Sequence, residues 1–499
     1  MMKVLSYVPL GYEGITVSVE VDIRRGIPGT EIVGMPGTAV REARERVRVA
    51  LKNSGFTYPR DRILVNLSPA DLPKLGSGFD LAIAVAVLSS SGQLTGQDFD
   101  VLLAVGELGL DGSIRRVPGV IAAVAAAKDA GIRRVLVPEA NLTEAIPLFR
   151  EGLVSGGTLK EAVARLQSAH SRIDYPPRRE LQPPPVPALR FEFLRQNQRA
   201  LRAAIIAASG RHNLLLVGPP GSGKTVLARS LPALLPPLTW SQSLEVTRIH
   251  SQAGVLPPDT SLITRPPFRS PHHTASTQGI VGGGSKLLPG EISLAHHGIL
   301  FLDEALEFRK NVLQSLREPM ERRRVYLARA GRTFWFPAHF QLIMASNACP
   351  CGNLGKSATH CSCSFEEVSR YWRRLGGPLL DRMPLRVPFG IDDAGEAFEN
   401  PESIEEARRS IVAARAAGEL RRRKGNPTDL SLSAGCGKIL RRASDYFALS
   451  RRGQAGALSV ARTIADLEGS DDLGEGHLLE AIAHRSFLEG TDNHPALSW

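Results

Sequence analysis

The chain has 499 residues, of which 43% are hydrophobic and 22% charged, and this composition indicates a globular protein with more than one domain. Lysine plus arginine exceed aspartate plus glutamate by 61 to 50, so the formal net charge is +11 and nucleic acid is the favoured polyanionic partner. We expect a cytoplasmic protein with no membrane contact: the first residues do not read as a signal peptide, no apolar run could span a bilayer, and the crowded cysteines are no secreted disulfide framework.

The first region, residues 1–168, alternates short β-branched runs with alanine-rich helical stretches, which predicts an α/β or α+β domain. The predicted strands include GITVSVEVDI, RILVNLS and RRVLVPEA, and the predicted helices TAVREARERVRVALKNSG and GVIAAVAAAKDAG. The segment 106–141, which begins GELGLDG and ends VLVPEAN, resembles the proteolytic domain of Lon. That resemblance implies a Lon-protease-C-like fold, of the ribosomal S5 domain 2-like type.

The same resemblance indicates what the domain lacks. Lon-type proteases need a serine nucleophile and a lysine base. Ala123 stands at the position of the lysine and Gly78 at that of the serine, with Ser77 one residue before it. A methyl group cannot accept a proton, so we predict no peptidase activity; the alternative is an improvised pair of Ser77 with Lys74 or Lys128. We expect the domain to serve assembly or DNA engagement, as similar domains do in other recombination ATPases.

Three further regions differ in composition. Residues 169–190 are rich in proline and predict an extended, semi-rigid linker. Residues 191–395 show a second α/β pattern, and residues 396–499 carry Ala, Leu, Arg and Glu at helical spacing, which predicts a small helical domain. The basic run RRRKGNP at 421–427 is interpreted as a loop between two helices, because glycine and proline interrupt it.

A glycine-rich turn stands between a short apolar strand and a helix in the second α/β region. It reads GPPGSGKT at 218–225 and follows the strand 214–217. Backbone N–H groups in such a turn converge on a β-phosphate, the lysine reaches the β- and γ-phosphates, and the final hydroxyl binds magnesium. We therefore predict a P-loop ATPase that binds ATP and Mg²⁺ through Gly218, Pro219, Pro220, Gly221, Ser222, Gly223, Lys224 and Thr225.

Two later strands end in polar side chains that suit the same site. GILFLDE at 298–304 places Asp303 and Glu304 at a strand end, where we expect Asp303 to hold magnesium and Glu304 to act as the base that polarises water. QLIMASN at 341–347 ends in Asn347, whose neutral amide can orient the attacking water. A turn asparagine at a strand end is the alternative for Asn347.

Two segments are candidates for the nucleic-acid surface. VGGGSKLLPG at 281–290 has the composition of a mobile loop and carries Lys286. The segment 321–340 predicts a β-hairpin with basic and aromatic side chains, which can neutralise phosphates and stack on bases. The alternative is that the aromatic side chains pack into the core and the arginines face solvent. The nucleic-acid contacts we predict are Lys286, Arg324, Arg329 and Arg332.

Four cysteines form a C-x-C…C-x-C pattern within fifteen residues. Cys349, Cys351, Cys361 and Cys363 could bind zinc tetrahedrally, with His360 as an alternative ligand. Their spacing is tighter than the usual C-x2-C, so reduced and merely packed cysteines remain the alternative.

The sequence around these motifs resembles that of a known family. The stretch 268–308, FRSPHHTASTQGIVGGGSKLLPGEISLAHHGILFLDEALEF, together with EVTRIHSQAG, ACPCG, GPLLDR and ARTIADLEG, is similar to the magnesium-chelatase-like AAA+ ATPases. Within that group the chain resembles the ComM/YifB family of competence-related ATPases over nearly its whole length. The resemblance implies an AAA+ P-loop α/β core followed by a C-terminal helical lid.

The resemblance also implies residues and partners that spacing alone does not. Arg382 stands where the family has its arginine finger, and Arg452 where it has a second sensor of the γ-phosphate, with Arg462 as a nearby candidate. An arginine supplied to a neighbouring subunit implies a homo-hexameric ring. The family implies ATP-driven branch migration or unwinding of recombination intermediates during natural transformation, with single-stranded or branched DNA as the partner. The alternatives are a protein remodeller and a magnesium-chelatase motor subunit, both without DNA contact.

Overall fold

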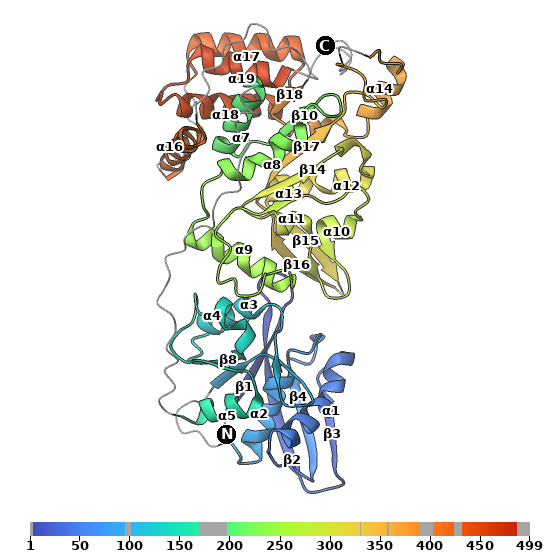
Figure 1. Cartoon of the computed structure of the whole chain (residues 1–499), viewed down its shortest axis with the longest axis vertical. Helices are drawn as coiled ribbons and strands as arrows, with labels where there is room; N and C mark the ends of the chain where they lie inside the picture. Colours follow the sequence, from blue (N-terminus) through green and yellow to red (C-terminus); the bar gives the residue numbers. More distant parts are fainter. Residues whose placement is uncertain are drawn as a thin grey trace.

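The computed structural model describes residues 3–94, 101–168, 197–329, 331–356, 359–389, 403–423 and 432–486. The molecule is elongated, with the N-terminal elements at one end, a second α/β unit in the middle and a group of helices at the other end (Figure 1). The mixed α/β, multidomain class expected from the sequence is what the structure has. The predicted linker lies outside the described residues, and the domain boundaries stay predictions. Among the described residues, no helix is long and apolar enough to cross a membrane.

The N-terminal unit is built on a seven-stranded mixed sheet of order β3-β4-β2-β1-β5-β8-β9, in which β2 runs antiparallel to both β1 and β4. Its strands are β1 (Lys3–Val8), β2 (Ile15–Arg24), β3 (Gly29–Val33), β4 (Arg62–Ser68), β5 (Val101–Ala104), β6 (Glu107–Leu108), β7 (Ile114–Arg115), β8 (Arg134–Pro138) and β9 (Leu153–Gly156). Its helices are α1 (Thr38–Asn53), α2 (Asp80–Ser90), α3 (Val120–Asp129), η1 (Glu139–Asn141), α4 (Leu142–Ala145) and α5 (Leu159–Gln167). Helix α2 is apolar on every side and is buried along most of its length, whereas α1 buries one face at three- to four-residue spacing.

The central unit is a five-stranded parallel sheet of order β11-β14-β17-β10-β18. Its inner strands are buried on both faces, so they read as continuous apolar runs. The strands are β10 (Leu214–Val217), β11 (Phe268–Arg269), β14 (Ile299–Leu302), β17 (Gln341–Ser346) and β18 (Leu385–Pro388), with two ribbons, β12 (Gly282–Gly283) with β13 (Leu288–Pro289) and β15 (Arg324–Arg329) with β16 (Arg332–Pro337). The helices are α7 (Gln198–Gly210), α8 (Lys224–Leu234), α9 (Trp240–Gln252), α10 (Thr277–Val281), α11 (Glu291–Leu294), η2 (Ala305–Glu307), α12 (Lys310–Ser315), α13 (Arg317–Arg322), α14 (Phe365–Trp372) and α15 (Gly377–Leu380).

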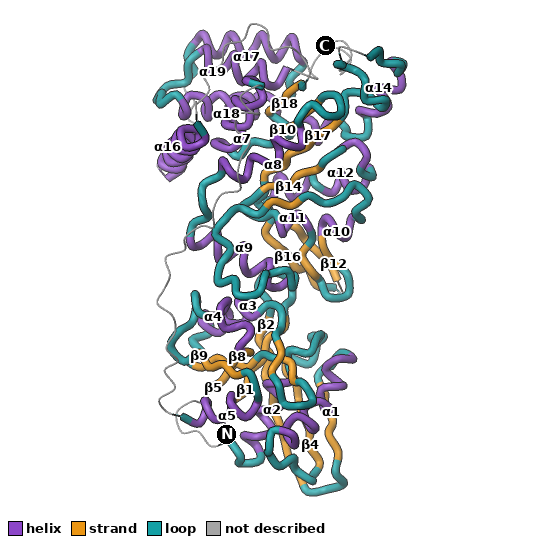
Figure 2. The backbone as a smooth tube through the Cα atoms, viewed as in Figure 1, coloured by secondary structure: helices purple, strands orange, loops and turns teal. Residues whose placement is uncertain are grey.

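The C-terminal unit is helical in all its described elements, as Figure 2 shows. It consists of α16 (Ile404–Arg423), α17 (Ala434–Phe447), α18 (Arg451–Leu467) and α19 (Glu475–Ser486). These helices share one hydrophobic core with α7, α8 and one face of the parallel sheet. Residues 421–423, which we interpreted as part of a loop, are the last turn of α16, because arginine is a good helix former and suits a helix C-terminus.

The N-terminal unit contacts the central unit through α9 and the β15–β16 ribbon. The Gly119 N–H donates to the Ser251 hydroxyl at 3.0 Å, and that hydroxyl donates to the buried Glu144 carboxylate at 2.6 Å. The Tyr12 ring lies between the Arg248 guanidinium, 4.4 Å from its centroid, and the Trp335 ring at 5.4 Å. The expected hairpin therefore forms, and its aromatic side chains pack at a domain junction.

Candidate functional site

The turn after β10 has the geometry of a phosphate-binding loop. A Cβ on Gly218 would lie 2.6 Å from the Phe389 Cβ, so only glycine fits there, and Gly223 has φ +97° where it caps the first residue of α8. The Lys224 ammonium donates to the carbonyl oxygens of Gly218 at 2.8 Å and Pro219 at 2.7 Å. A lysine held by carbonyl groups in this way can exchange them for phosphate oxygens.

Burial changes the protonation of that lysine. Desolvation lowers the pKa of Lys224 to about 8, and the charge of Asp303 opposes the shift. A bound triphosphate would supply the negative charge that the buried ammonium lacks, so nucleotide binding and protonation of Lys224 favour each other.

The carboxyl ends of the parallel strands bring the predicted magnesium ligands together. The Thr225 hydroxyl donates to the Asp303 carboxylate at 3.0 Å. Thr225 is the last residue of the P-loop, and Asp303 directly follows β14. Oxygen ligands of this kind suit Mg²⁺.

Glu304 stands beside Asp303 in a left-handed backbone conformation with φ +49°, and its side chain is 60% exposed. The Nδ1 atom of His273 lies 3.6 Å from its carboxylate. His273 is a neighbour that the sequence analysis did not identify, although its motif, SPHHTAS, was part of the resemblance. It is placed to orient the carboxylate.

Asn347 follows β17 next to the end of β10, because Val217 and Ser346 are paired in the sheet. Among the described residues, its side-chain amide has no hydrogen-bond partner. The Gly218 N–H donates to the Ser346 carbonyl at 3.1 Å, so the strand that carries Asn347 is tied to the P-loop itself.

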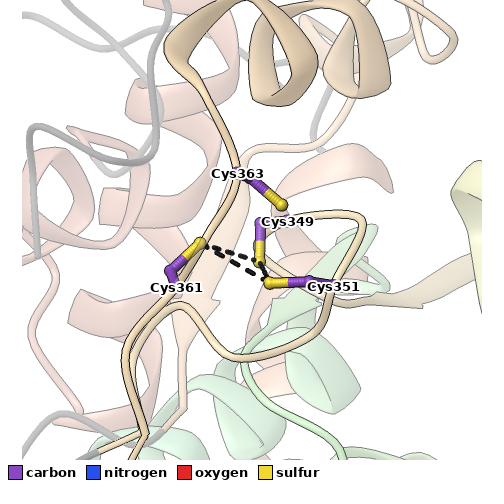
Figure 3. A group of neighbouring side chains, drawn as sticks. All are labelled: Cys349, Cys351, Cys361 and Cys363. Carbon is purple, nitrogen blue, oxygen red and sulfur yellow. Dashed lines mark hydrogen bonds between the residues drawn. The ribbon is translucent and has the colours of Figure 1, made fainter.

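The four predicted cysteines come together directly after Asn347, as Figure 3 shows. The sulfur atoms of Cys349, Cys351 and Cys361 are 3.4 to 3.6 Å apart, and all four sulfurs lie within 4.8 Å of one another. A tetrahedral zinc with Zn–S bonds of about 2.3 Å needs sulfur atoms about 3.8 Å apart, so the cluster fits the ion. His360 is exposed and is not part of the group.

The cysteine loop also contacts the P-loop. A Cβ on Gly352 would lie 3.1 Å from the Pro220 ring, and Gly352 has φ +74°. The Trp372 indole N–H donates to the Ala348 carbonyl at 3.0 Å and holds the loop from the other side. The loop therefore supports the P-loop and the Asn347 strand together.

Arg382 lies at the opposite end of the parallel sheet from the P-loop. The Asn213 amide, directly before β10, donates to the Arg382 carbonyl at 2.9 Å. The Arg382 side chain is 9% exposed and forms an ion pair with Glu321 of α13, and its Nε has no partner among the described residues. Four residues of β10, about 13 Å of strand, separate this end from the P-loop.

Arg452 shares that carboxylate, since its guanidinium also pairs with Glu321. The Ser450 hydroxyl caps α18 and donates to Asp381 at 2.6 Å, which fixes the start of the helix beside Arg382. The alternative candidate, Arg462, pairs with Asp466 at 3.0 Å inside the helical unit. The structure thus places Arg382 and Arg452 together and away from Lys224.

The predicted nucleic-acid residues gather at the domain junction. Arg329 donates to the Gly284 carbonyl at 3.4 Å and to the Ser285 carbonyl, while Arg332 pairs with Asp71 of the N-terminal unit. Arg324 lies 4.2 Å above the Trp335 ring. All four predicted residues, Lys286, Arg324, Arg329 and Arg332, are exposed.

Among the described residues, Ser77 forms no hydrogen bond with Lys74 or Lys128, the alternative protease pairs named above. The Ser77 hydroxyl donates to Glu107, and the fully buried Lys74 donates to the Pro69 carbonyl. Lys128 is exposed on α3.

A partly buried group of one carboxylate and two histidines was not predicted from the sequence. Glu245 of α9 accepts hydrogen bonds from His296 at 2.9 Å and His297 at 2.8 Å, which hold the pKa of Glu245 well below its usual range. The spacing resembles a metal site, but the His339 N–H donates to Nδ1 of His296 at 3.0 Å. Because burial lowers the pKa of His296 to about 4, the ring is neutral and its proton is on the Nε2 that faces Glu245. The group is a hydrogen-bonded brace between α9 and the start of β14.

Family models match most of the chain and leave residues 1–18, 142–189, 395–400 and 486–499 outside their bounds. Family descriptions match in three places: "Magnesium chelatase, subunit ChlI" over 190–394, "Subunit ChlI of Mg-chelatase" over 19–141 and "Magnesium chelatase, subunit ChlI C-terminal" over 401–485.

Similar proteins match at nearly full length. The chain is 39% identical over 488 residues to the uncharacterized protein YifB of Salmonella typhimurium, covering 96% of this chain and 95% of that protein. It is 38% identical over 488 residues to YifB of Escherichia coli, with coverage of 96% and 95%. It is 36% identical over 515 residues to the competence protein ComM of Haemophilus influenzae, with 97% of each chain covered.

Proposed function

The chain belongs to the ComM/YifB family of magnesium-chelatase-like AAA+ ATPases, and on that premise we propose that its ATP hydrolysis drives branch migration or unwinding of DNA recombination intermediates during natural transformation. The observation that carries the ATPase assignment is the convergence of Lys224, Thr225, Asp303 and Glu304 at the carboxyl end of one parallel sheet. These side chains are the parts that phosphoryl transfer needs.

The proposed roles follow from the contacts. Lys224 would leave the loop carbonyls and pair with the β- and γ-phosphates. Thr225 and Asp303 would hold Mg²⁺, whose charge would offset that of the phosphate oxygens. Glu304 orients and deprotonates the attacking water, with His273 positioning the carboxylate and Asn347 holding the water from the other side.

Oligomerisation is proposed from the position of the two arginines. Arg382 and Arg452 lie at the amino end of the sheet, so neither can reach the nucleotide of its own chain without a large rearrangement. We propose that both guanidinium groups bind the γ-phosphate in the site of a neighbouring copy. To do so they leave the Glu321 carboxylate. A closed ring, for which we propose six copies, gives every P-loop such a neighbour.

DNA is proposed as the moved partner on three grounds. The chain carries a net charge of +11, one relative is named a competence protein, and exposed arginines surround the β15–β16 ribbon. Lys286, Arg324, Arg329 and Arg332 are the proposed phosphate contacts. The N-terminal unit, with its proposed Lon-like fold, holds this ribbon in place from the outside.

Zinc is proposed for the four cysteines, where it would be structural and would brace the P-loop through the contact between Gly352 and Pro220. Metal analysis of the purified chain should find one zinc per chain, lost when Cys351 and Cys361 are both changed to serine. If the native chain contains no zinc, the zinc proposal is wrong and the four cysteines are reduced thiols that only pack together.

The deciding experiment measures ATP turnover with and without DNA, and the separation of a four-way junction. Single-stranded or branched DNA should stimulate hydrolysis, and the junction should separate only with ATP. Glu304→Gln is the control that binds ATP and does not move the junction. Normal basal turnover that DNA does not stimulate would contradict the DNA proposal and favour a protein remodeller or chelatase-type motor.

A further inference from the structure

A cavity of about 210 Å³ lies between the N-terminal unit and the central unit. One wall contains Ser77, Gly78 and Ala123, the positions at which the resemblance to Lon would place protease chemistry. The opposite wall is formed by residues 286–289, which belong to the ribbon β12–β13. A pocket of the N-terminal unit is therefore lined in part by a segment of the ATPase unit.

Leu287 is the residue that makes this contact. Its side chain is 5% exposed and belongs to the hydrophobic core of the N-terminal unit, although the residue lies in the central unit. Its backbone is left-handed, with φ +50°, which is unfavourable for leucine. The next residue, Leu288, is 40% exposed. A strained leucine directed into another domain indicates a built contact, because burial must offset the strain.

The β12–β13 ribbon around Leu287 contains consecutive glycines that can act as a hinge, and it is held by Arg329. Three consecutive glycines, 282 to 284, have φ between +79° and +121°, conformations that other residues adopt at a cost. The Arg329 side chain holds the carbonyl groups of Gly284 and Ser285. The sequence predicted a mobile loop for 281–290. In the structure this segment is a ribbon that is held at two places: Leu287 packs on the N-terminal core, and Arg329 donates to the carbonyl groups of Gly284 and Ser285.

In the docked arrangement, two of the arginines proposed to bind DNA are already bonded to other groups of the protein. Arg329 donates to loop carbonyls, and Arg332 pairs with the Asp71 carboxylate, which occupies the place a phosphate would take. The same ribbon that carries Arg332 packs Leu327 and Phe334 on the N-terminal core. Phosphate binding by Arg332 competes with an ion pair between the two units, and phosphate binding by Arg329 competes with the hydrogen bonds that hold the β12–β13 ribbon.

We propose that Leu287 docks on the N-terminal core of this same chain at the edge of the cavity, and that the docked β12–β13 ribbon is a latch that DNA releases by taking Arg329 and Arg332 from their internal partners. This proposal rests on the proposed DNA function. In the latched state the ribbon carrying Lys286 is fixed against the N-terminal unit. In the released state the glycine hinge lets the ribbon follow the DNA.

The first arm of the test measures docking without DNA, by trypsin cleavage after Lys286 in the full-length chain. Leu287→Asp places a charge in an apolar cavity and should speed this cleavage by at least about tenfold. Leu110→Asp adds the same charge at a leucine that is 56% exposed and does not line the cavity, and it should leave the rate nearly unchanged, as should the volume-conserving Leu287→Met. Equal cleavage of Leu287→Asp and wild type would overturn docking.

The second arm measures affinity for a fluorescein-labelled single-stranded oligonucleotide by anisotropy, at fixed salt. Leu287→Asp should bind about three- to tenfold more tightly despite its added negative charge, because no docking contact opposes DNA. Leu287→Met should match wild type. Unchanged or weaker binding by Leu287→Asp would overturn the latch and leave the DNA function standing. No binding by any variant would overturn the DNA function and the latch with it.

Discussion

The two ends of the central parallel sheet differ in what they hold. The carboxyl end gathers Lys224, Thr225 and Asp303 around a space for phosphate, whereas the amino end gathers Arg382 and Arg452 around the single carboxylate of Glu321. One end has the binding groups of an ATPase without its arginines, and the other has two arginines without a nucleotide. This difference is what the proposed site, shared between neighbouring copies, would require.

The largest expected effect tests this division directly. Arg382→Ala should lower ATP turnover by about 10³-fold or more, as loss of an arginine finger does, while leaving ATP binding intact. Lys224→Ala should abolish binding. An equal mixture of the two inactive variants should regain measurable turnover, because some interfaces then pair an intact P-loop with an intact arginine.

The mixture is the decisive comparison. Each variant alone serves as the control, and assembly is checked by light scattering with ATP present. A mixture that assembles and remains as inactive as its components would mean that Arg382 does not serve a neighbouring copy.

At the carboxyl end alone, Glu304→Gln should bind ATP normally and lose turnover by roughly 10²- to 10⁴-fold, because an amide cannot accept the proton of the attacking water. Glu307→Gln is the matched control: it lies three residues on, and its partial exposure and pairing with Arg374 give it no part in the site. Comparable losses in both variants would place the base elsewhere.

The same end should show a pH dependence that the other end does not. The pKa of Lys224 is lowered to about 8 by burial, and only the protonated form pairs with phosphate. Above that pH, ATP binding requires proton uptake, so the dissociation constant should rise about tenfold per pH unit. Calorimetry in buffers of different ionisation enthalpy measures the uptake; an affinity that is flat through this range would contradict the assigned pKa.

The smallest expected effect concerns Glu321. Its ion pairs with Arg382 and Arg452 compete with the phosphate of a neighbouring copy, and its side chain is 45% exposed, so the competition is weak. Glu321→Gln should strengthen ATP-dependent assembly about two- to fivefold. Glu318→Gln, which removes the same charge from the same helix, should change nothing.

How far the sequence predicts this molecule depends on whether a feature is local. The P-loop and the strand ends at Asp303 and Asn347 are readable because a few consecutive residues specify strand, turn and helix. The parallel register then brings the three together, as the pairing of Val217 with Ser346 shows. The family resemblance was confirmed by full-length relatives.

Features that are assembled from distant segments could not be predicted from the sequence. Glu321 joins two arginines that lie 61 and 131 residues further along the chain, and no periodic pattern encodes that meeting. Leu287 belongs to a glycine-rich stretch whose composition suggests mobility, yet a pocket of another domain orders it. Tertiary contacts decide such segments, because local propensity there is weak.

The core shared between the sheet and the C-terminal helices has a consequence for unfolding. Helix α7 packs against both, and one continuous apolar cluster runs from Leu214 and Ile343 to Ile411, Ile464 and Leu478. The N-terminal unit is built around two other clusters, to which the central unit adds Leu287. The central and C-terminal units should therefore melt as one cooperative block, separately from the N-terminal unit. A chain cut between β18 and α16 would expose half of that cluster to water and would not retain a folded sheet.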